Sequence, residues 1–176
     1  MNDFNLEQYL KDRDNIGYKE LNKKYNIIFD YHLGDSIGMP ENWIIIFDKG
    51  KNNVCTFDLD NGLSKHTIST EDLNNIKECI NKNKYIFTDG KVASSKVLDG
   101  TTHTINVSDG NNFVSIETFN LWYWFFDGDV MKEDISEEEK QYTKCLINLI
   151  NDIQKILDNY DLCIELNYCD YGDEDE

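Results

Sequence analysis

The last third of the chain carries the longest helical periodicity in the sequence. Apolar residues return there at steps of three or one, which predicts an amphipathic helix of about 24 residues. The stripe consists of Tyr142, Cys145, Leu146, Leu149, Ile150, Ile153, Ile156, Leu157 and Tyr160. Ser136 with Glu139 three residues later forms a capping box at its start. Because such a stripe must be buried, the rest of the chain has to supply an apolar surface.

Apolar segments separated by short turns precede this helix. They are residues 26–32, 43–48, 54–59, 63–68, 84–88, 103–107 and 113–119, and residues 162–166 could add an edge strand. The turns include Asp60-Asn61-Gly62 and Ser108-Asp109-Gly110-Asn111, whose residues tolerate the positive φ angles of tight hairpins. Short connections join antiparallel strands. We therefore expect a largely antiparallel sheet of about six or seven strands.

Shorter helices complete the expected fold. Residues 4–25 have helical spacing with a break at Gly17, and a central helix begins at Ser69 or Thr70. The apolar stripe of the central helix is Leu73, Ile76, Cys79 and Ile80. The fold class is thus α+β, with the sheet packed against the long C-terminal helix. We expect one globular domain over residues 1–166 and an acidic, mobile tail over residues 167–176.

Composition and cysteine usage indicate a soluble cytoplasmic protein. The chain is 40% hydrophobic, which argues against disorder, yet no apolar run reaches the roughly 18 residues that span a bilayer. The N-terminal residues lack the layout of a signal peptide. Its five cysteines form no C-x-x-C pair, so they suggest neither a zinc site nor a disulfide framework. We expect no metal and no cofactor.

Charge is the strongest global signal. The net charge is −17, and residues 127–176 hold sixteen acidic and four basic residues, a net of −12. Such a field repels nucleic acid and anionic membranes and attracts basic proteins. Arg13 is the only arginine. Because arginine is the usual bidentate partner of phosphate, this composition argues against a phosphate-handling site.

An aromatic stretch, FNLWYWFFDGD, spans residues 119–129 and ends in two carboxylates. Read as a strand, it is aromatic on both faces. One face can enter the core. The other is either covered by the N-terminal helices, or a partner surface, or the wall of a small-molecule pocket. Exposed aromatic patches mark binding sites and dominate interface energetics. The candidate partner-binding residues are Trp122, Tyr123, Trp124, Phe126, Asp127, Asp129, Glu133 and Asp134.

Several patterns resemble catalytic or metal-binding sites but fit ordinary structure better. Asp127, Asp129 and Glu138 have calcium-loop spacing, but the loop lacks the required glycine and one oxygen ligand. Asp58 and Asp60 fit turn chemistry better than a metal pair. On adjacent strands, His66 and His103 could meet near Cys55 and form a nucleophile pair or metal site, although lone strand histidines are more often structural. No nucleotide-binding, hydrolase or metalloprotease motif is present in the sequence. We expect no enzyme activity.

In size, acidity and α+β character the chain resembles the bacterial immunity proteins that neutralise cationic toxins, especially nucleases. The resemblance lies in general character and in no motif. Heavy use of Asn, Lys and Ile also indicates an AT-rich, bacterial genome. The resemblance implies a non-catalytic, acidic module that binds a basic protein such as a cognate toxin. The alternatives are a small-ligand-binding protein or enzyme with an aromatic-walled pocket, or a structural domain whose aromatic residues are all buried.

Overall fold

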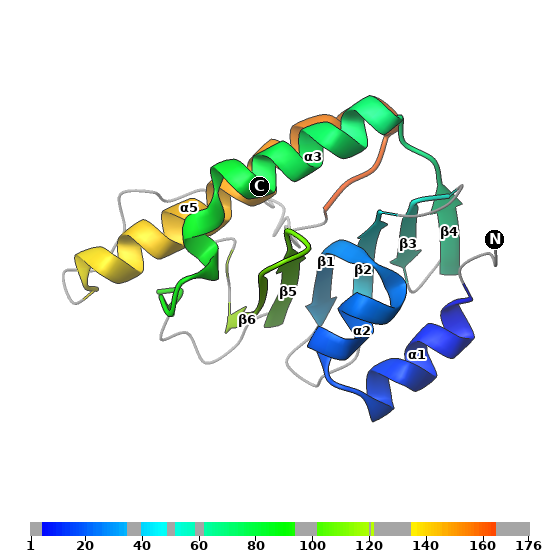
Figure 1. Ribbon diagram of the computed structural model, residues 1–176, viewed down its shortest axis with the longest axis horizontal. Coiled ribbons are helices and arrows are strands. Elements are labelled where there is room, and N and C mark those ends of the chain that lie inside the picture. The colour runs from blue at the N-terminus through cyan, green and yellow to red at the C-terminus, as the bar shows by residue number, and fades with distance from the viewer. Residues whose placement is uncertain are drawn as a thin grey trace, which may run out of the picture.

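The computed structural model describes residues 5–34, 40–48, 52–58, 62–93, 102–119, 121 and 135–164 (Figure 1). Within them one six-stranded sheet lies between two layers of helices. The elements in chain order are α1 (Leu6–Asn15), α2 (Tyr18–Tyr25), β1 (Ile27–Gly34), β2 (Pro40–Phe47), β3 (Val54–Asp58), β4 (Gly62–His66), α3 (Thr70–Lys82), the 3₁₀ helix η1 (Lys84–Phe87), β5 (Thr102–Ser108), β6 (Phe113–Phe119), α5 (Glu137–Leu157) and the 3₁₀ helix η2 (Asp158–Tyr160).

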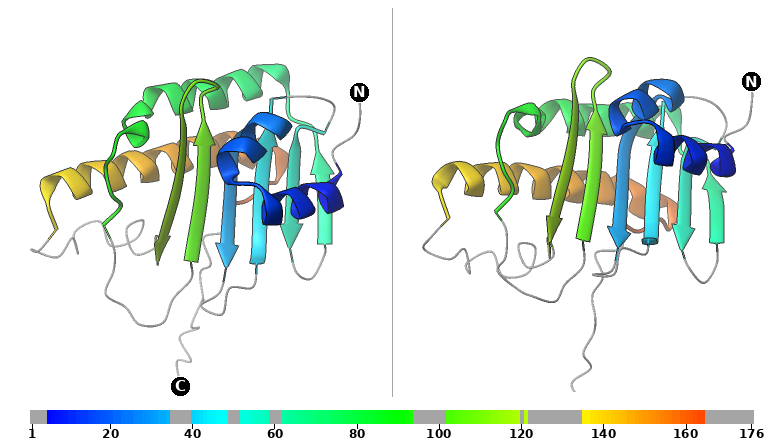
Figure 2. Two further views of the ribbon diagram at one scale, coloured as in Figure 1. Left: turned by 60° about the horizontal axis from the view of Figure 1, so that its bottom comes forward. Right: turned by 90° about the horizontal axis from the view of Figure 1, so that it is seen from below.

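The sheet is antiparallel throughout, with the strand order β4-β3-β2-β1-β5-β6. The first four strands form a meander. The chain then passes through α3 and η1 and returns as β5 on the free side of β1, where Tyr31 pairs with Ile105. Helices α1 and α2 cover one face of the sheet, and α3 and α5 cover the other (Figure 2). The predicted α+β class and antiparallel sheet are confirmed.

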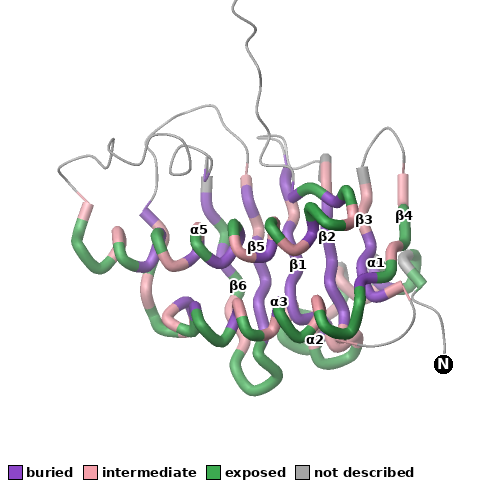
Figure 3. Tube along the Cα trace, turned by 90° about the horizontal axis from the view of Figure 1, so that it is seen from above, coloured by how far each residue is buried: buried purple, intermediate pink, exposed green. Residues whose placement is uncertain are grey.

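The face under α3 and α5 holds the larger apolar core. Phe29 and Leu33 of β1, Ile44 and Ile46 of β2, and Ile105 of β5 point into it by strand alternation. Helix α5 adds Leu146, Leu149, Ile150, Ile153 and Leu157, which belong to the stripe predicted from the sequence. Its capping box is formed, because Ser136 and Glu139 each accept from the other's backbone N–H. In Figure 3 the strands are mostly buried and the outward sides of the helices exposed.

The opposite face holds a smaller apolar cluster under the N-terminal helices. Tyr9 of α1 and Leu21 of α2 are buried there. They pack with Ile27, Ile45, Phe47 and Cys55 from the first three strands. Residues 43–47 are therefore buried on both sides of the sheet, as the run WIIIF predicts.

Two predicted strands are wrong. Residues 84–87 form η1, because they follow the end of α3 directly and the chain has no length in which to turn into the sheet. There Tyr142 of α5 donates to the carbonyl of Ile86 at 2.8 Å. Residues 162–164 form no strand, since Gln154 of α5 donates to Leu162 O and accepts from Ile164 N. Two of their backbone groups thus bond to one side chain, and Leu162 N donates to Leu157 O at 3.2 Å, so none of these three groups bonds to a sheet edge.

Among the described residues, no helix combines the length and the apolar character needed to cross a bilayer. The acidic tail predicted at residues 167–176 lies outside the described residues.

Candidate functional site

The partner-binding residues predicted from the sequence all lie outside the described residues: Trp122, Tyr123, Trp124, Phe126, Asp127, Asp129, Glu133 and Asp134. The structure does describe one residue on each side of them. Leu121 is fully buried in the larger core, and Ile135 packs half-buried against it. Of the aromatic stretch, Leu121 is therefore core, and the role of the aromatic rings after it remains a prediction.

In the described part of the chain eleven carboxylates and ten lysines are exposed, so most of the excess negative charge belongs to residues outside it. Glu137 and Glu138 are exposed on the first turn of α5, and Asp158 and Asp161 are exposed at its far end. Other exposed carboxylates in the described part of the chain are Glu7, Glu20, Glu71, Glu78, Asp89, Asp109 and Glu117. Some lysines pair with carboxylates, as Lys11 does with Glu7 at 3.1 Å, but exposed pairs of this kind contribute little to stability.

The structure separates the three residues that could have formed a nucleophile pair or metal site. Cys55 faces α1 and α2, whereas His66 and His103 face α3 and α5. The two histidines lie on β4 and β5, with three strands between them. At about 4.8 Å per strand spacing they are at least about 19 Å apart. The hypothesis that they lie on adjacent strands is therefore wrong.

Each histidine has a separate partner. His103 is buried, and its Nδ1 lies 2.7 Å from the hydroxyl of Tyr31, while burial lowers the pKa of His103 to about 4. His66 is half-buried, and its Nε2 lies 3.0 Å from the hydroxyl of Thr56. A neutral, buried His103 is a structural group.

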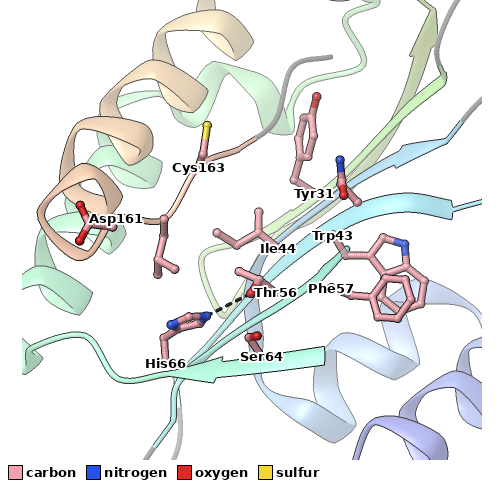
Figure 4. A pocket seen from close by; sticks show the side chains of 11 residues that line it. Tyr31, Trp43, Ile44, Thr56, Phe57, Ser64, His66, Asp161 and Cys163 are labelled. Atoms are coloured by element: carbon pink, nitrogen blue, oxygen red, sulfur yellow. Dashed lines mark hydrogen bonds between the residues drawn. The ribbon is translucent and has the colours of Figure 1, made fainter. Parts of the chain in front are cut away.

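A pocket of about 360 Å³ lies on the same face, between β2–β4 and the segment that follows η2 (Figure 4). Its lining residues are Tyr31, Asn42, Trp43, Ile44, Thr56, Phe57, Ser64, His66, Asp161, Leu162 and Cys163. By strand alternation the side chains of Trp43 and Phe57 belong to the opposite face, so Tyr31 is the main aromatic ring on the pocket side. The paired Thr56 and His66 offer polar contacts at its floor.

A second pocket, of about 640 Å³, lies at the other end of the strands between α2, α3 and the β5–β6 turn. Its walls are largely polar, with Asn22, Asn26, Asn81 and Asp109 among them. Lys77 and Asp48 also line it and form an ion pair at 2.5 Å. The pocket is also lined by Lys23, Glu78 and Asp109, so its net charge is only −1 and it makes no strong demand for a charged ligand.

A polar cluster lies between α1 and the sheet, beside the smaller apolar cluster. Asp30 of β1 is buried, and its Oδ2 accepts from Tyr9 Oη at 3.3 Å and from Asn106 Nδ2 at 3.2 Å. Burial raises the pKa of Asp30 to about 6, although Arg13 and the two hydrogen bonds act to lower it. Burial also raises the pKa of Tyr9 far above its usual value, so its hydroxyl keeps the proton that it donates.

Arg13, on the same side of α1, forms the second half of the cluster. Its Nη2 lies 3.1 Å from His32 Nδ1 and 3.3 Å from the hydroxyl of Tyr18, and its Cζ lies 5.0 Å from the centre of the Trp43 ring. Burial, and next the charge of Arg13, lower the pKa of His32 to about 4. The only arginine of the chain thus packs against the sheet instead of pointing into solvent.

The sequence pattern alone does not bring these residues together. A signal is present, because Asp30 and His32 sit two residues apart in an otherwise apolar strand and must share a face. The contribution of Arg13 cannot be read from the pattern, since it depends on how α1 crosses the sheet. No protein-family model matches the chain, and no curated protein matches it. Its function is therefore inferred from the chemistry of these residues.

Proposed function

We propose that the protein is a non-catalytic, acidic module that binds a basic protein. Its class is that of bacterial immunity or inhibitor proteins, which neutralise cationic toxins such as nucleases in the cytoplasm. The observation that carries the proposal is the distribution of charge. The net charge is −17, most described carboxylates are exposed, and the only arginine is partly buried between α1 and the sheet.

Physical reasoning supports this role in two ways. A strongly negative surface raises the rate at which a basic partner associates, because the field steers the encounter. Aromatic anchors then prolong the complex, since Trp and Tyr are enriched among hot-spot residues. Both kinds of residue are concentrated in residues 122–134, directly before the exposed Glu137 and Glu138 of α5.

The first experiment identifies the partner and measures the salt dependence of association. Co-purification from the native host with mass spectrometry supplies the partner, and stopped-flow kinetics then follow association from about 20 to about 500 mM NaCl. We expect the association rate to fall by about tenfold or more, because salt screens the field within roughly a Debye length. An association rate that stays flat over this range contradicts the steering argument.

Charge variants test which carboxylates act. Changing Asp127, Asp129 and Asp134 together to Asn should slow association and flatten its salt dependence. The matched control removes three exposed charges elsewhere, by changing Glu7, Glu20 and Glu71 on α1, α2 and α3 to Gln. The control should change the rate much less, since it leaves the proposed surface intact. If both sets of variants slow association equally, the partner is steered only by the overall field of the protein. That result would contradict the assignment of residues 122–134 as the binding surface.

Alanine variants of the aromatic residues separate a recognition surface from core. If one of Trp122, Tyr123, Trp124 and Phe126 is a surface residue, changing it to Ala should weaken partner binding by about 2 kcal/mol or more. Its free energy of unfolding should change by no more than about 0.5 kcal/mol. If every variant instead loses roughly 3–5 kcal/mol of folding stability, these rings are core and the proposed surface is wrong.

The pocket beside Thr56 and His66 favours one alternative, a small-ligand-binding protein or enzyme. Its volume of about 360 Å³ suits a small molecule, and it is lined by histidine, hydroxyl and carboxylate residues. This alternative predicts a ligand whose binding is lost in His66→Asn and Ser64→Val variants. It also predicts that binding of a basic protein is absent or independent of residues 122–134.

A further inference from the structure

The pocket of about 640 Å³ lies at the end of the sheet where the β5–β6 turn meets α2 and α3. Figure 2 shows this turn beside the two helices. Four separate parts of the chain line the pocket, within residues 22–28, at Asp48, and within residues 77–81 and 108–111. Its volume is typical of small-molecule sites, and the fold alone brings these segments together.

Amide and hydroxyl side chains supply much of the polar wall, namely Asn22, Asn26, Asn81, Asn111 and Ser108. Asn22 and Asn26 each donate through Nδ2 to a backbone carbonyl, which fixes their orientation. Asn81 and Asn111 are exposed, and their side-chain amides make no hydrogen bond within the described residues. Each of these amides offers both donors and an acceptor. They therefore suit a ligand whose own groups both donate and accept.

The two lysines of the wall already have partners. Lys77 pairs with Asp48 at 2.5 Å, and Lys23 pairs with Glu20 at 3.0 Å. The described lining residues thus offer an anion no unpaired cation, and the net charge of −17 repels it further. An anionic ligand is therefore disfavoured in this pocket.

The carboxylates of the wall also leave little for a cation. Asp109 Oδ1 accepts from the backbone N–H groups of Asn111 at 2.9 Å and Asn112 at 2.7 Å, and its Oδ2 accepts from Asn112 Nδ2 at 2.9 Å. Among the described lining residues, Glu78 is the carboxylate without an ion pair or a hydrogen bond. No metal-binding group of three or more His, Cys, Asp or Glu side chains occurs in the part of the chain that the structure describes. One free carboxylate suits a hydroxyl donor better than a metal ion.

The remaining wall is apolar, because Ile27, Ile28 and Ile80 border the pocket. Sugars match this combination of surfaces. Their hydroxyl groups both donate and accept hydrogen bonds, as the amides do, and their C–H faces pack on aliphatic side chains. A neutral sugar also meets no charge penalty in a wall whose net charge is −1.

We propose that this pocket binds a neutral saccharide, whose hydroxyl groups bond to the amides of Asn81 and Asn111 and to the carboxylate of Glu78. The site is separate from the acidic partner-binding surface of residues 122–134. Its test needs no protein partner, so the two proposals can fail independently.

The side-chain NH₂ resonances of Asn81 and Asn111 report on occupancy. In ¹⁵N-labelled full-length protein they are assigned by their loss in Asn81→Ala and Asn111→Ala. They are then followed during titration with the methyl glycosides of glucose, galactose and mannose, each to about 200 mM. We expect at least one glycoside to give a saturable shift with a dissociation constant in the millimolar range, because water competes for every hydrogen bond. The uronate of the sugar that binds, at constant ionic strength, should bind at least tenfold more weakly.

Paired variants assign the binding to the named groups. Asn81→Ala with Asn111→Ala should weaken glycoside binding at least tenfold, since two hydrogen-bonding side chains are lost. The matched control is Asn74→Ala with Asn151→Ala, which removes two exposed asparagines that do not line the pocket and should leave binding unchanged. If the first pair does not fold, Glu78→Gln takes its place and should weaken binding at least threefold.

Three results would overturn the proposal. One is the absence of a saturable shift with all three glycosides. Another is equal binding by the two pairs of asparagine variants, or wild-type binding by Glu78→Gln where it is the substitute. The third is a uronate that binds as tightly as its neutral sugar, because the pocket would then not select against negative charge.

Discussion

The two faces of the sheet are built from the same strands but differ in chemistry. The face under α3 and α5 holds the larger apolar core, and its buried polar pair is Tyr31 with His103. The face under α1 and α2 combines a smaller apolar cluster with Asp30, Arg13, His32 and Asn106. The first face therefore supplies most of the burial that stabilises the fold. The second carries groups whose protonation and hydrogen bonding can change.

Helix length accounts for part of this difference. Helix α5 has 21 residues and α3 has 13, whereas α1 and α2 have 10 and 8. A long amphipathic helix covers a wide strip of sheet with one apolar stripe. Two short helices cover less, so charged side chains at their margins reach the sheet. Polar strand residues such as Asp30 and His32 then gain partners from α1.

The largest expected contrast is between leucines buried on the two faces. Leu149→Ala on α5 should lower the free energy of unfolding by about 4 kcal/mol, because the long helix cannot move to fill the cavity. Leu21→Ala on α2 should cost about 2 kcal/mol, since the short helices can shift toward the space. Urea denaturation of both variants measures the difference. An equal or larger loss for Leu21→Ala would contradict the ranking of the faces.

The pH dependence of stability should reveal the buried carboxylate of the second face. The pKa of Asp30 is about 6 in the folded protein against an ordinary value of 3.8, so the folded state holds its proton more tightly. Its contribution to stability is present below about pH 4 and is lost as the pH rises through 6. That loss is roughly 3 kcal/mol.

Comparing Asp30→Asn with the wild type isolates this effect from other groups. The variant should gain up to about 3 kcal/mol relative to the wild type between about pH 4 and about pH 6.5. His32 and His103 have lowered pKa values and act in the opposite direction, but both remain in the variant and cancel in the difference. Urea unfolding at half-unit pH steps provides the measurement. A stability difference that does not vary with pH would show that Asp30 is not desolvated.

The buried polar pair of the first face should contribute less than an apolar core residue. Tyr31→Phe removes the 2.7 Å hydrogen bond to His103 and should cost about 1–2 kcal/mol of unfolding free energy. The control is Tyr85→Phe, because Tyr85 is half-buried and its hydroxyl has no hydrogen bond within the described residues. Thermal or urea unfolding compares the two. A smaller loss for Tyr31→Phe than for Tyr85→Phe would contradict the assignment of a structural role.

The smallest effects should come from the helix caps of the two layers. Ser136→Ala removes the capping box of α5 and should cost about 1 kcal/mol. Helix α2 begins at Gly17, which has no side-chain cap and has open space where a Cβ would lie. Gly17→Ser should therefore stabilise the protein by a few tenths of a kcal/mol. Precise urea titrations can resolve the sign of the change in the free energy of unfolding for each variant. A Gly17→Ser variant that is less stable than the wild type would contradict the second expectation.

Much of the fold follows from local signals in the sequence. The spacing of apolar residues and the capping box predicted α5 and its continuation through η2, because a helix records its buried face every three or four residues. The turn at Ser108–Asn111 and the alternation of His103, Ile105 and Val107 likewise predicted the β5–β6 hairpin. The candidate partner-binding residues from Trp122 to Asp134 came from composition alone and stay a prediction.

Tertiary structure decided what depends on residues distant in the sequence. Residues 84–87 have strand-forming side chains, yet they form η1 because they follow α3 directly and pack on α5. The pairing of β5 with β1 separated His66 from His103, and the crossing of α1 brought Arg13 to His32 and Trp43. Periodicity records which face of an element is buried. It does not record which element covers that face, because that choice depends on the packing of the whole chain.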